Sequence, residues 1–341
     1  MRILLIGAVP PPHGGISVHV LGIHRRLTAA GIPCAILNPS RIHGRIAFAW
    51  ALLRRARRGW TVHAHTNGHN RRSWLLALIC GLAGQSSGLC ILTLHSGMAP
   101  AYLEQDSAWG RKLAAFVCRL YTRVICVSPP IRAAVVSLGV PPERTEIAPA
   151  FLHAEFPQVP LNSLFLGWIE RHQPLFSTAL FFRPEYGFEL LVEGLARLKY
   201  RYPSLGCVVM GSGEQHADAS RRIREANLED NMLLAGDVDH DRCLALISRC
   251  DVFLRPTLQD GDSISVREAL SLGIRVVASD VGMRPAGSIL FRAGDVDDMV
   301  AKIEHAIAAK PCRTAPEPGC MDRLMEIYAQ VAASRRAYVS T

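Results

Sequence analysis

Short apolar runs of strand length recur along the chain and alternate with stretches of helical length. In the first half these runs predict six strands, at residues 2–9, 34–38, 61–65, 89–95, 123–128 and 145–148. The second half repeats the plan from Thr178 onward. Alternating strands and helices form parallel sheets that are covered by helices on both faces. The pattern therefore predicts two doubly wound, Rossmann-like α/β domains, joined near residues 153–175, with a cleft between them.

The segment from residue 251 to residue 285 is the most informative part of the second half. Residues 251–256 and the valine-rich residues 275–279 predict two strands, and residues 265–272 between them have helix-favouring composition. Gly273 follows this predicted helix, at the position where a left-handed backbone commonly ends one. The loop after the first of the two strands therefore opens at the edge where α/β sheets bind ligands.

This loop and the start of the predicted helix carry two acidic residues eight positions apart, Asp260 and Glu268, with Gly261, Ser263 and Ser265 between them. A glycine-relaxed backbone that enters a helix is suited to bind an anion, because unpaired N–H groups and the helix dipole point at it. The two carboxylates are suited to hold sugar hydroxyls. The segment therefore predicts a site for a sugar phosphate.

Two other interpretations of these acids stay open. Ser265-x-x-Glu268 is a capping-box signature, in which the glutamate only satisfies an N–H group at the helix start. Asp260-Gly261-Asp262 could instead bind a divalent cation through its carboxylates. We favour the sugar-phosphate site over both, because the capping box leaves Asp260 unexplained and the two-domain pattern argues against a metal-dependent fold.

Composition supports two domains without a membrane span. The 341 residues exceed the roughly 250 to 300 at which single cores stop growing. The ten cysteines include no Cys-x-x-Cys pair and lie mostly in apolar runs, as buried thiols in a reducing compartment do. No export signal is convincing, and the longest apolar run, residues 74–84, is far shorter than the roughly 20 residues a transmembrane helix needs. We therefore expect a cytoplasmic protein.

The positive charge is concentrated in the first half. Residues 1–155 hold 17 Lys and Arg against 5 Asp and Glu, whereas residues 156–341 hold 21 against 24. Residues 45–60 combine bulky apolar side chains with clustered arginines, and basic residues again precede apolar ones at 71–74 and 111–116. This composition favours helices on an anionic membrane surface, although a sheet-covering helix with solvated arginines has the same pattern. No nucleic-acid motif accompanies the charge, so we do not expect nucleic acid as a partner.

Histidines gather near the ends of two predicted strands in the first half. His63 and His65 alternate along one strand and therefore share a face, with His69 nearby. A metal pair is conceivable, but no carboxylate or thiolate clearly completes a ligand set, so we interpret them as ordinary residues. His95 ends another strand at the edge where α/β sites form.

The acid, seven residues, Glu, Ala-Leu, Gly and Val-Val-Ala-Ser of residues 260–279 resemble the retaining glycosyltransferases of family 4, which have the GT-B fold. In that family the first acid is usually Glu, so Asp260 is a conservative departure. The resemblance covers most of the chain in the expected order. It continues through residues 2–20, with their double glycine, and through residues 206–213, 231–239, 244–257 and 289–303.

The resemblance implies a role for each residue of the site. Glu268 would hold the nucleotide ribose and Asp260 hydroxyls of the donor sugar, while His95 would face the transferred sugar. The backbone at Asp237 and Val238 would lie near the nucleotide base. The donor diphosphate would meet glycine loops and the helix start, at Gly14, Gly15, Gly211, Gly213, Gly261, Asp262, Ser263, Ile264 and Ser265.

One segment departs from the family. There an arginine and a lysine hold the donor pyrophosphate, but alignment on Gly187 puts Phe181 and Tyr186 at their positions. Arg183 lies two residues from Phe181 and, if the segment is a strand, keeps the same face. We therefore expect Arg183 to bind the diphosphate as a substitute.

These features predict a GT-B protein with an acceptor-side domain at residues 1–155, a nucleotide-sugar-binding domain at 156–320 and a helix at 321–341 that crosses back to the first domain. The resemblance implies transfer of a hexosyl or N-acetylhexosaminyl group from a nucleotide-diphosphate donor, with a UDP-sugar expected, to a hydroxyl of a lipid-linked glycan in surface polysaccharide assembly. It implies no metal and no other cofactor. We expect the protein on the inner face of the cell membrane. A sugar-nucleotide epimerase of the same fold and a catalytically idle component of a membrane complex remain alternatives.

Overall fold

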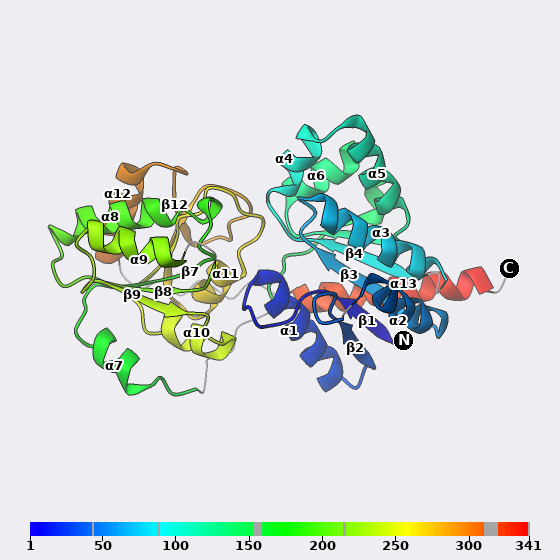
Figure 1. Ribbon diagram of the computed structural model, residues 1–341, viewed down its shortest axis with the longest axis horizontal. Helices are drawn as coiled ribbons and strands as arrows, with labels where there is room; N and C mark the ends of the chain where they lie inside the picture. The colour runs from blue at the N-terminus through cyan, green and yellow to red at the C-terminus, as the bar shows by residue number, and fades with distance from the viewer. Residues whose placement is uncertain (43, 87–88, 153–158, 214–215, 310–319, 340–341) are drawn as a thin grey trace. The chain divides into compact units, whose positions relative to one another are not determined.

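The computed structural model describes residues 1–341 except 43, 87–88, 153–158, 214–215, 310–319 and 340–341. The chain forms two compact units (Figure 1). The first consists of Met1–Pro10, Gly15–Leu152 and Gly319–Thr341, and the second of Pro11–Gly14 and His153–Pro318. Each unit is built around one six-stranded parallel sheet, so the predicted pair of doubly wound α/β sheets is confirmed.

The first sheet has the strand order β2-β1-β3-β4-β5-β6. All six predicted strands are present with shifts of a few residues at their ends; the opening strand stops at Ile6, four residues before the prolines Pro10, Pro11 and Pro12. The strands are β1 (Ile3–Ile6), β2 (Cys34–Leu37), β3 (Thr61–Thr66), β4 (Cys90–Leu94), β5 (Arg123–Cys126) and β6 (Thr145–Ile147).

Helices cover both faces of this sheet. Helix α1 (Gly15–Ala29) and the C-terminal α13 (Cys320–Val339) share one core cluster with the sheet, in which Val20, Ile23, Ile327 and Tyr328 are fully buried. The C-terminal helix is therefore part of the first unit. The other helices are α2 (Arg45–Arg57), α3 (Arg71–Gln85), α4 (Ala99–Gln105), α5 (Ala108–Arg119), α6 (Pro129–Ser137) and the short η1 (Pro142–Arg144).

The second sheet has the strand order β12-β11-β10-β7-β8-β9. The chain starts at β7, builds outward through β8 and β9, and returns to β10 on the other side of β7. Such a reversal is a topological switch point, where the loops leaving two adjacent strands diverge and open a place for a ligand. The strands are β7 (Leu175–Ala179), β8 (Gly206–Met210), β9 (Met232–Gly236), β10 (Val252–Arg255), β11 (Arg275–Ser279) and β12 (Ser288–Phe291).

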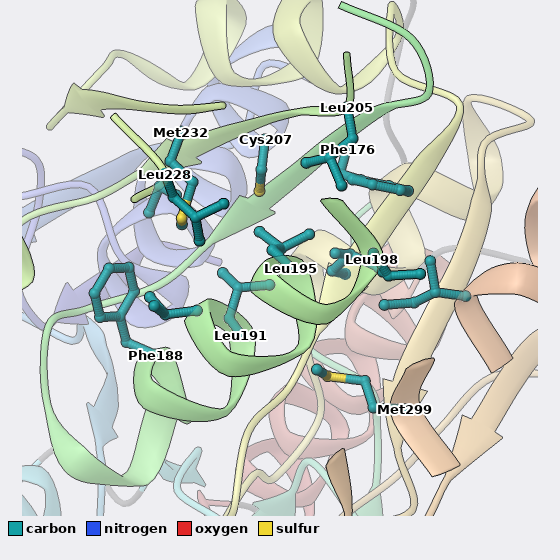
Figure 2. Close-up of a cluster of buried hydrophobic side chains, with 14 of the residues drawn as sticks. Phe176, Phe188, Leu191, Leu195, Leu198, Leu205, Cys207, Leu228, Met232 and Met299 are labelled. Carbon is teal, nitrogen blue, oxygen red and sulfur yellow. The ribbon is translucent and has the colours of Figure 1, made fainter. Parts of the chain in front are cut away.

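The core of the second unit is organised by α8. Its buried residues Phe188, Leu191, Leu195 and Leu198 follow the spacing of one helix face and pack against the sheet at Phe176 and its neighbours (Figure 2). Helix α12 completes this face, while α10 and α11 pack on the other. The helices are α7 (Ser163–Ile169), η2 (Pro184–Tyr186), α8 (Phe188–Lys199), α9 (His216–Glu225), α10 (His240–Ile247), α11 (Ile264–Ser271) and α12 (Val296–Ala308).

Candidate functional site

The two strands at the switch point of the second sheet are joined by an arginine. Arg255 is the last residue of β10, and its Nη1 donates a hydrogen bond of 2.7 Å to the carbonyl oxygen of Ala179, the last residue of β7. The Arg255 side chain is only 10% exposed. No motif singled out this arginine, although a charged residue at the end of an otherwise apolar strand is a usable signal of a functional position.

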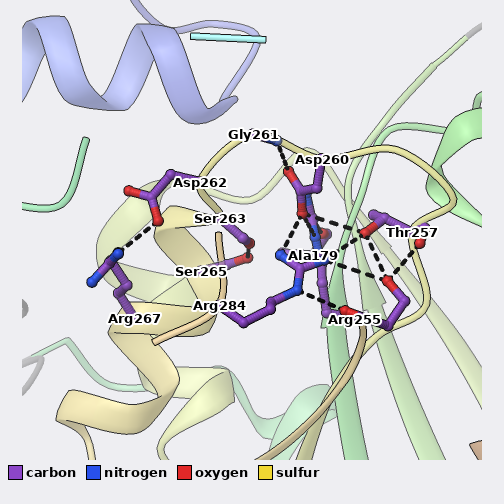
Figure 3. Close-up of polar contacts among 11 residues, drawn as sticks. Ala179, Arg255, Thr257, Asp260, Gly261, Asp262, Ser263, Ser265, Arg267 and Arg284 are labelled. Atoms are coloured by element: carbon purple, nitrogen blue, oxygen red, sulfur yellow. Dashed lines mark hydrogen bonds and ion pairs between the residues drawn. The ribbon is translucent and has the colours of Figure 1, made fainter. Parts of the chain in front are cut away.

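Asp260 binds two buried arginines at this place (Figure 3). Its Oδ2 accepts from Arg255 Nε at 3.0 Å, from Arg284 Nη1 at 2.9 Å and from Thr257 Oγ1 at 3.3 Å, while Oδ1 accepts from Gly261 N at 3.0 Å. Burial opposes ionisation of Asp260, but the charges and hydrogen bonds of the two arginines outweigh it and lower its pKa to about 2. Asp260 is therefore a carboxylate at neutral pH.

A close backbone contact holds the loop that carries Arg284 next to Asp260. Gly282 has φ of +71°, and a Cβ there would lie 2.5 Å from the carbonyl oxygen of Asp260. One residue later, Met283 N donates to Gly261 O at 2.7 Å. The loop after β11 is thus fixed against the loop after β10, and glycine is required at the point of closest approach.

Asp262 forms a second, separate ion pair. Its Oδ1 accepts from Arg267 Nε at 2.7 Å, and both side chains are almost fully buried. Since both acids of Asp260-Gly261-Asp262 are bound to arginines, positive charge already surrounds the oxygens that a divalent cation would use. The structure therefore gives no support to the metal interpretation of this tripeptide.

The structure contradicts the capping-box interpretation of Glu268. Helix α11 begins at Ile264 with Ser263 as its N-cap, and the Ser265 hydroxyl faces that of Ser263 at 3.2 Å. Glu268 Oε1 instead accepts a hydrogen bond of 2.6 Å from His240 Nε2 of α10. Because the Glu268 side chain is 7% exposed, His240 holds a nearly buried carboxylate in one orientation.

The fold itself requires glycine at two of the positions that are predicted to approach phosphate. Gly211 and Gly213 have φ of +145° and +155°, and a Cβ on either would collide with the backbone of Leu180 or Phe182. Their backbone positions are at the carboxyl end of β8, beside the switch point. A role in phosphate binding remains a prediction.

Asp237 lies next to the loop that clusters with the second unit. Its Oδ1 accepts from His13 N at 3.0 Å, and Val238 N donates to Gly236 O at 3.1 Å in the same turn. In this loop Gly14 lies against Phe181, whose ring would be 2.7 Å from an added Cβ. Gly15 begins α1 and belongs to the first unit.

The strand argument for Arg183 is wrong. β7 ends at Ala179, and Arg183 is the N-cap of η2 with an exposed side chain. Its guanidinium lies 5.8 Å from the ring centroid of Phe181. Phe181 and Tyr186 form an edge-to-face pair with centroids 5.8 Å apart, so the two positions expected to be cationic hold an aromatic pair.

His95 is partly buried and belongs to a histidine cluster at the carboxyl end of the first sheet. His65 Nδ1 and His95 Nε2 are 3.1 Å apart, and His19 Nδ1 is 2.6 Å from Ala150 O. His63, on the same face of β3 as His65, bonds Tyr328 and Thr93. Burial, reinforced by the neighbouring histidines, holds the pKa of His95 well below its usual value, so its imidazole is neutral at pH 7.

Three of these histidines are the described residues nearest to a metal-binding geometry. One ring nitrogen each of His19, His65 and His95 lies within 4.8 Å of the other two. No described carboxylate or thiolate joins the group. The hydrogen bond between His65 and His95 accounts for their approach without an ion.

Two family profiles match the chain in succession. The profile described as Glycosyltransferase Family 4 matches residues 13–156, and the one described as Glycosyl transferases group 1 matches residues 172–315. The chain belongs to the group 1 glycosyltransferases. The segment that holds Asp260 and Glu268 thus lies within the group 1 match, and the prediction of a GT-B glycosyltransferase is confirmed at the level of group 1.

Solved structures confirm the GT-B fold of this group 1 chain. HepE of Anabaena in complex with UDP and glucose has a TM-score of 0.72 at 15% identity, covering 99% of this chain and 100% of HepE. Sucrose-phosphate synthase of Thermosynechococcus elongatus has a TM-score of 0.71 at 17% identity, covering 98% and 100%. At such identities the likeness establishes the fold alone.

The curated relatives match the chain at low identity. A phosphatidylinositol N-acetylglucosaminyltransferase subunit of Arabidopsis thaliana is 28% identical over 45% of this chain, and the match covers 35% of that protein. The matching gpi3 subunit of Schizosaccharomyces pombe is covered over 45% of its length. The chain therefore spans less than half of these two relatives. The 2-deoxystreptamine glucosyltransferase of Streptomyces kanamyceticus is 25% identical over 92% of this chain and 82% of that protein.

Proposed function

We propose that the chain transfers a hexosyl or N-acetylhexosaminyl group, with retention, from a nucleotide-diphosphate donor to a hydroxyl of a lipid-linked glycan. The observation that carries the proposal is the loop and helix start after β10, where Asp260 and Glu268 flank the first turn of α11 at the switch point of a Rossmann-like sheet. Membership of the group 1 family supports the reaction class. A UDP-sugar is the donor we favour, because the similar HepE has been solved with UDP and with UDP-glucose.

The proposed chemistry uses charge held in place before the substrate binds. The first-turn N–H groups of α11, from Ile264 onward, provide donors for the phosphate groups as negative charge grows on the leaving diphosphate. Asp260 has one lightly used oxygen, Oδ1, for a sugar hydroxyl, and Glu268 offers Oε2 to the ribose. In this scheme the neutral His95 contacts the transferred sugar, and the leaving phosphate accepts the acceptor's proton, so no protein base or metal is needed.

The surface of the first unit supports an acceptor at a membrane. Trp50 on α2 is 65% exposed, and Trp109 and Phe116 on α5 are 71% and 51% exposed, with basic residues on the same helices. Apolar side chains beside arginines suit the boundary of an anionic bilayer. None of the described helices has both the length and the apolar character needed to span a bilayer. Relatives named for phosphatidylinositol and for lipopolysaccharide core synthesis support a lipid-linked acceptor in surface polysaccharide assembly.

A second candidate is a non-catalytic subunit of a membrane complex. The aromatic pair Phe181 and Tyr186 favours it, because both positions are expected to be cationic in an active enzyme. Several relatives are also named as subunits.

Donor turnover separates the two candidates. The wild-type chain and a Glu268→Ala variant are incubated with a panel of nucleotide sugars and a membrane lipid extract, and release of nucleoside diphosphate is followed with and without a chelator. We expect lipid-dependent release from one donor, unaffected by the chelator and lost in the variant. Glu193→Ala, which changes a half-exposed glutamate on α8, is the matched control and should retain release. Binding to lipid vesicles without release from any donor would favour the non-catalytic candidate.

A further inference from the structure

We propose that Arg255 binds the diphosphate of the nucleotide ligand and supplies the positive charge that is absent at Phe181 and Tyr186. This inference rests on the proposed function and adds the residue that recognises the diphosphate. Arg255 then replaces Arg183 as the expected substitute.

The position of Arg255 is the first argument. It ends β10 and hydrogen-bonds the end of β7, so its guanidinium lies between the two strands at which the strand order reverses. The loops that leave these strands run in opposite directions, and ligands of open parallel sheets bind in the resulting space. Helix α11, whose N-terminus favours anions, starts nine residues after Arg255.

The charge of the cluster is the second argument. Arg255 and Arg284 carry two positive charges against the single negative charge of Asp260, so the three residues together are positive by one unit. Uncompensated charge in a largely buried place is costly unless a partner neutralises it. An anion at the switch point would supply that partner.

The hydrogen bonds of Arg284 and Arg255 indicate a different role for each arginine. Arg284 donates through Nε to Ser279 O, through Nη1 to Asp260 and through Nη2 to Thr257, which uses all three of its nitrogens. Arg255 donates to Asp260 through Nε and to Ala179 through Nη1. Among the described residues, the Tyr186 side chain is a further partner of the Arg255 guanidinium, and a phosphate oxygen can displace it. Arg284 is therefore a positioning residue, and Arg255 is the one that can reach a phosphate.

The third argument is that the aromatic pair contacts Arg255, so the positive charge lies next to the positions where the family has its cations. The Tyr186 ring centroid is 5.2 Å from Arg255 Cζ, so the side chain at one expected cationic position contacts the guanidinium from β10. Gly187 fixes this contact, because a Cβ there would lie 1.9 Å from the carbonyl oxygen of Pro256, next to Arg255. A phosphate oxygen is a stronger partner for the guanidinium than the neutral Tyr186 side chain and can replace it.

The test measures binding of a nucleoside diphosphate against its own nucleoside. Isothermal titration with UDP, GDP, ADP, CDP and TDP identifies the base, and the matching nucleoside then reports contacts that do not involve phosphate. We expect Arg255→Gln to weaken binding of the diphosphate at least tenfold and to leave binding of the nucleoside within twofold. Arg183→Gln, the matched control, should change neither by more than twofold.

A second variant distinguishes loss of the diphosphate contact from loss of the folded structure. Arg255→Gln/Tyr186→Lys places an ammonium group next to the vacated guanidinium position and should recover part of the diphosphate affinity, with melting temperatures recorded for every variant. Equal weakening of nucleoside and diphosphate binding, or a larger effect of Arg183→Gln than of Arg255→Gln, would overturn the role of Arg255. If the wild-type chain bound no nucleoside diphosphate at all, the proposed function would fail first, which is a different result.

Discussion

Asp260 stabilises the fold through its ion pairs and also offers an oxygen atom to a ligand. It neutralises one of two buried arginines while keeping one oxygen lightly used. Its pKa of about 2 lies below the usual value of a carboxylate, so the pairing contributes stability at neutral pH. This contribution is lost only as the pH falls from about 4 through 2, well outside the physiological range.

Asp260→Asn should destabilise the second unit strongly. The change leaves Arg255 and Arg284 facing each other without a counter-charge, and breaking a buried ion pair in this way costs about 3 to 5 kcal/mol. The free energy of unfolding in urea measures the effect. Glu193→Gln, which breaks a half-exposed pair with Arg197, should cost less than about 1 kcal/mol. A similar small cost for Asp260→Asn would mean that the cluster is hydrated and its charge is not buried.

Gly282→Ala should also destabilise the second unit, through the backbone. Gly282 combines φ of +71° with a 2.5 Å approach to the Asp260 carbonyl, so alanine introduces both strain and a collision. Gly294→Ala is a matched control, because φ there is +80° and an added Cβ would have no neighbour within 4 Å. We expect about 1 kcal/mol for the control from strain alone, and clearly more for Gly282→Ala in the same urea titration. Equal costs would show that the loop yields to the added methyl group.

At the scale of elements, the helices α2 and α5 carry the proposed membrane contact. Trp50→Ser and Trp109→Ser together should weaken sedimentation with vesicles that contain anionic lipid by several-fold, since each change removes an exposed aromatic ring beside arginines. Tyr200→Ser, which changes a side chain that is 92% exposed in the second unit, is the control and should bind as the wild type does. Undiminished binding by the double variant would show that the membrane contact does not depend on these side chains of α2 and α5.

Element types and their order could be predicted from sequence because burial on both faces of a parallel sheet leaves continuous apolar runs. The strand 275–279 was predicted with its observed bounds, and α11 within one residue. The positions of Asp260 and Glu268 followed from that order. Their partners did not, because Arg284 reaches Asp260 only through the contact at Gly282, and His240 comes from a different helix. Such pairings depend on packing between loops distant in sequence, which periodicity does not report.

The prediction that Arg183 shares a strand face with Phe181 failed for a similar reason. The segment 180–183 continues the backbone bonding of β7, with Leu180 N donating to Met210 O and Phe182 N to Ser212 O, but it turns into η2 before a strand face is established. The prediction assumed alternation where the chain was already leaving the sheet. We propose that the charge comes instead from Arg255 of β10, a strand that pairs with β7 but lies 72 residues after Arg183 in the sequence.

At the scale of whole units, the buried histidines should make the first unit sensitive to acid. Burial lowers the pKa of His19 to about 4 and that of His63 to about 3, whereas both return to about 6.5 in the unfolded chain. Between these values only the unfolded chain binds the protons, so stability is complete above pH 6.5 and falls as the pH decreases. Each histidine contributes up to about 1.4 kcal/mol per pH unit.

Replacing one of these histidines should flatten that dependence. His63→Gln keeps hydrogen-bonding groups near Tyr328 and Thr93 but cannot be protonated, so its free energy of unfolding should decline less steeply than that of the wild type between pH 6.5 and 5. Urea titrations at several pH values measure both slopes. Parallel slopes would show that His63 is already protonated in the folded chain.

The packing of α13 affects the order in which the chain can fold. Ile327 and Tyr328 of this helix are buried in the same cluster as Ile3 and Leu5 of β1, yet the whole second sheet lies between them in the sequence. During synthesis on a ribosome, the first sheet therefore emerges long before the helix that completes its core. The second sheet, from Leu175 to Phe291, has all its strands available earlier. The unit made first is thus expected to be finished last, with its apolar face exposed to chaperones in the interval.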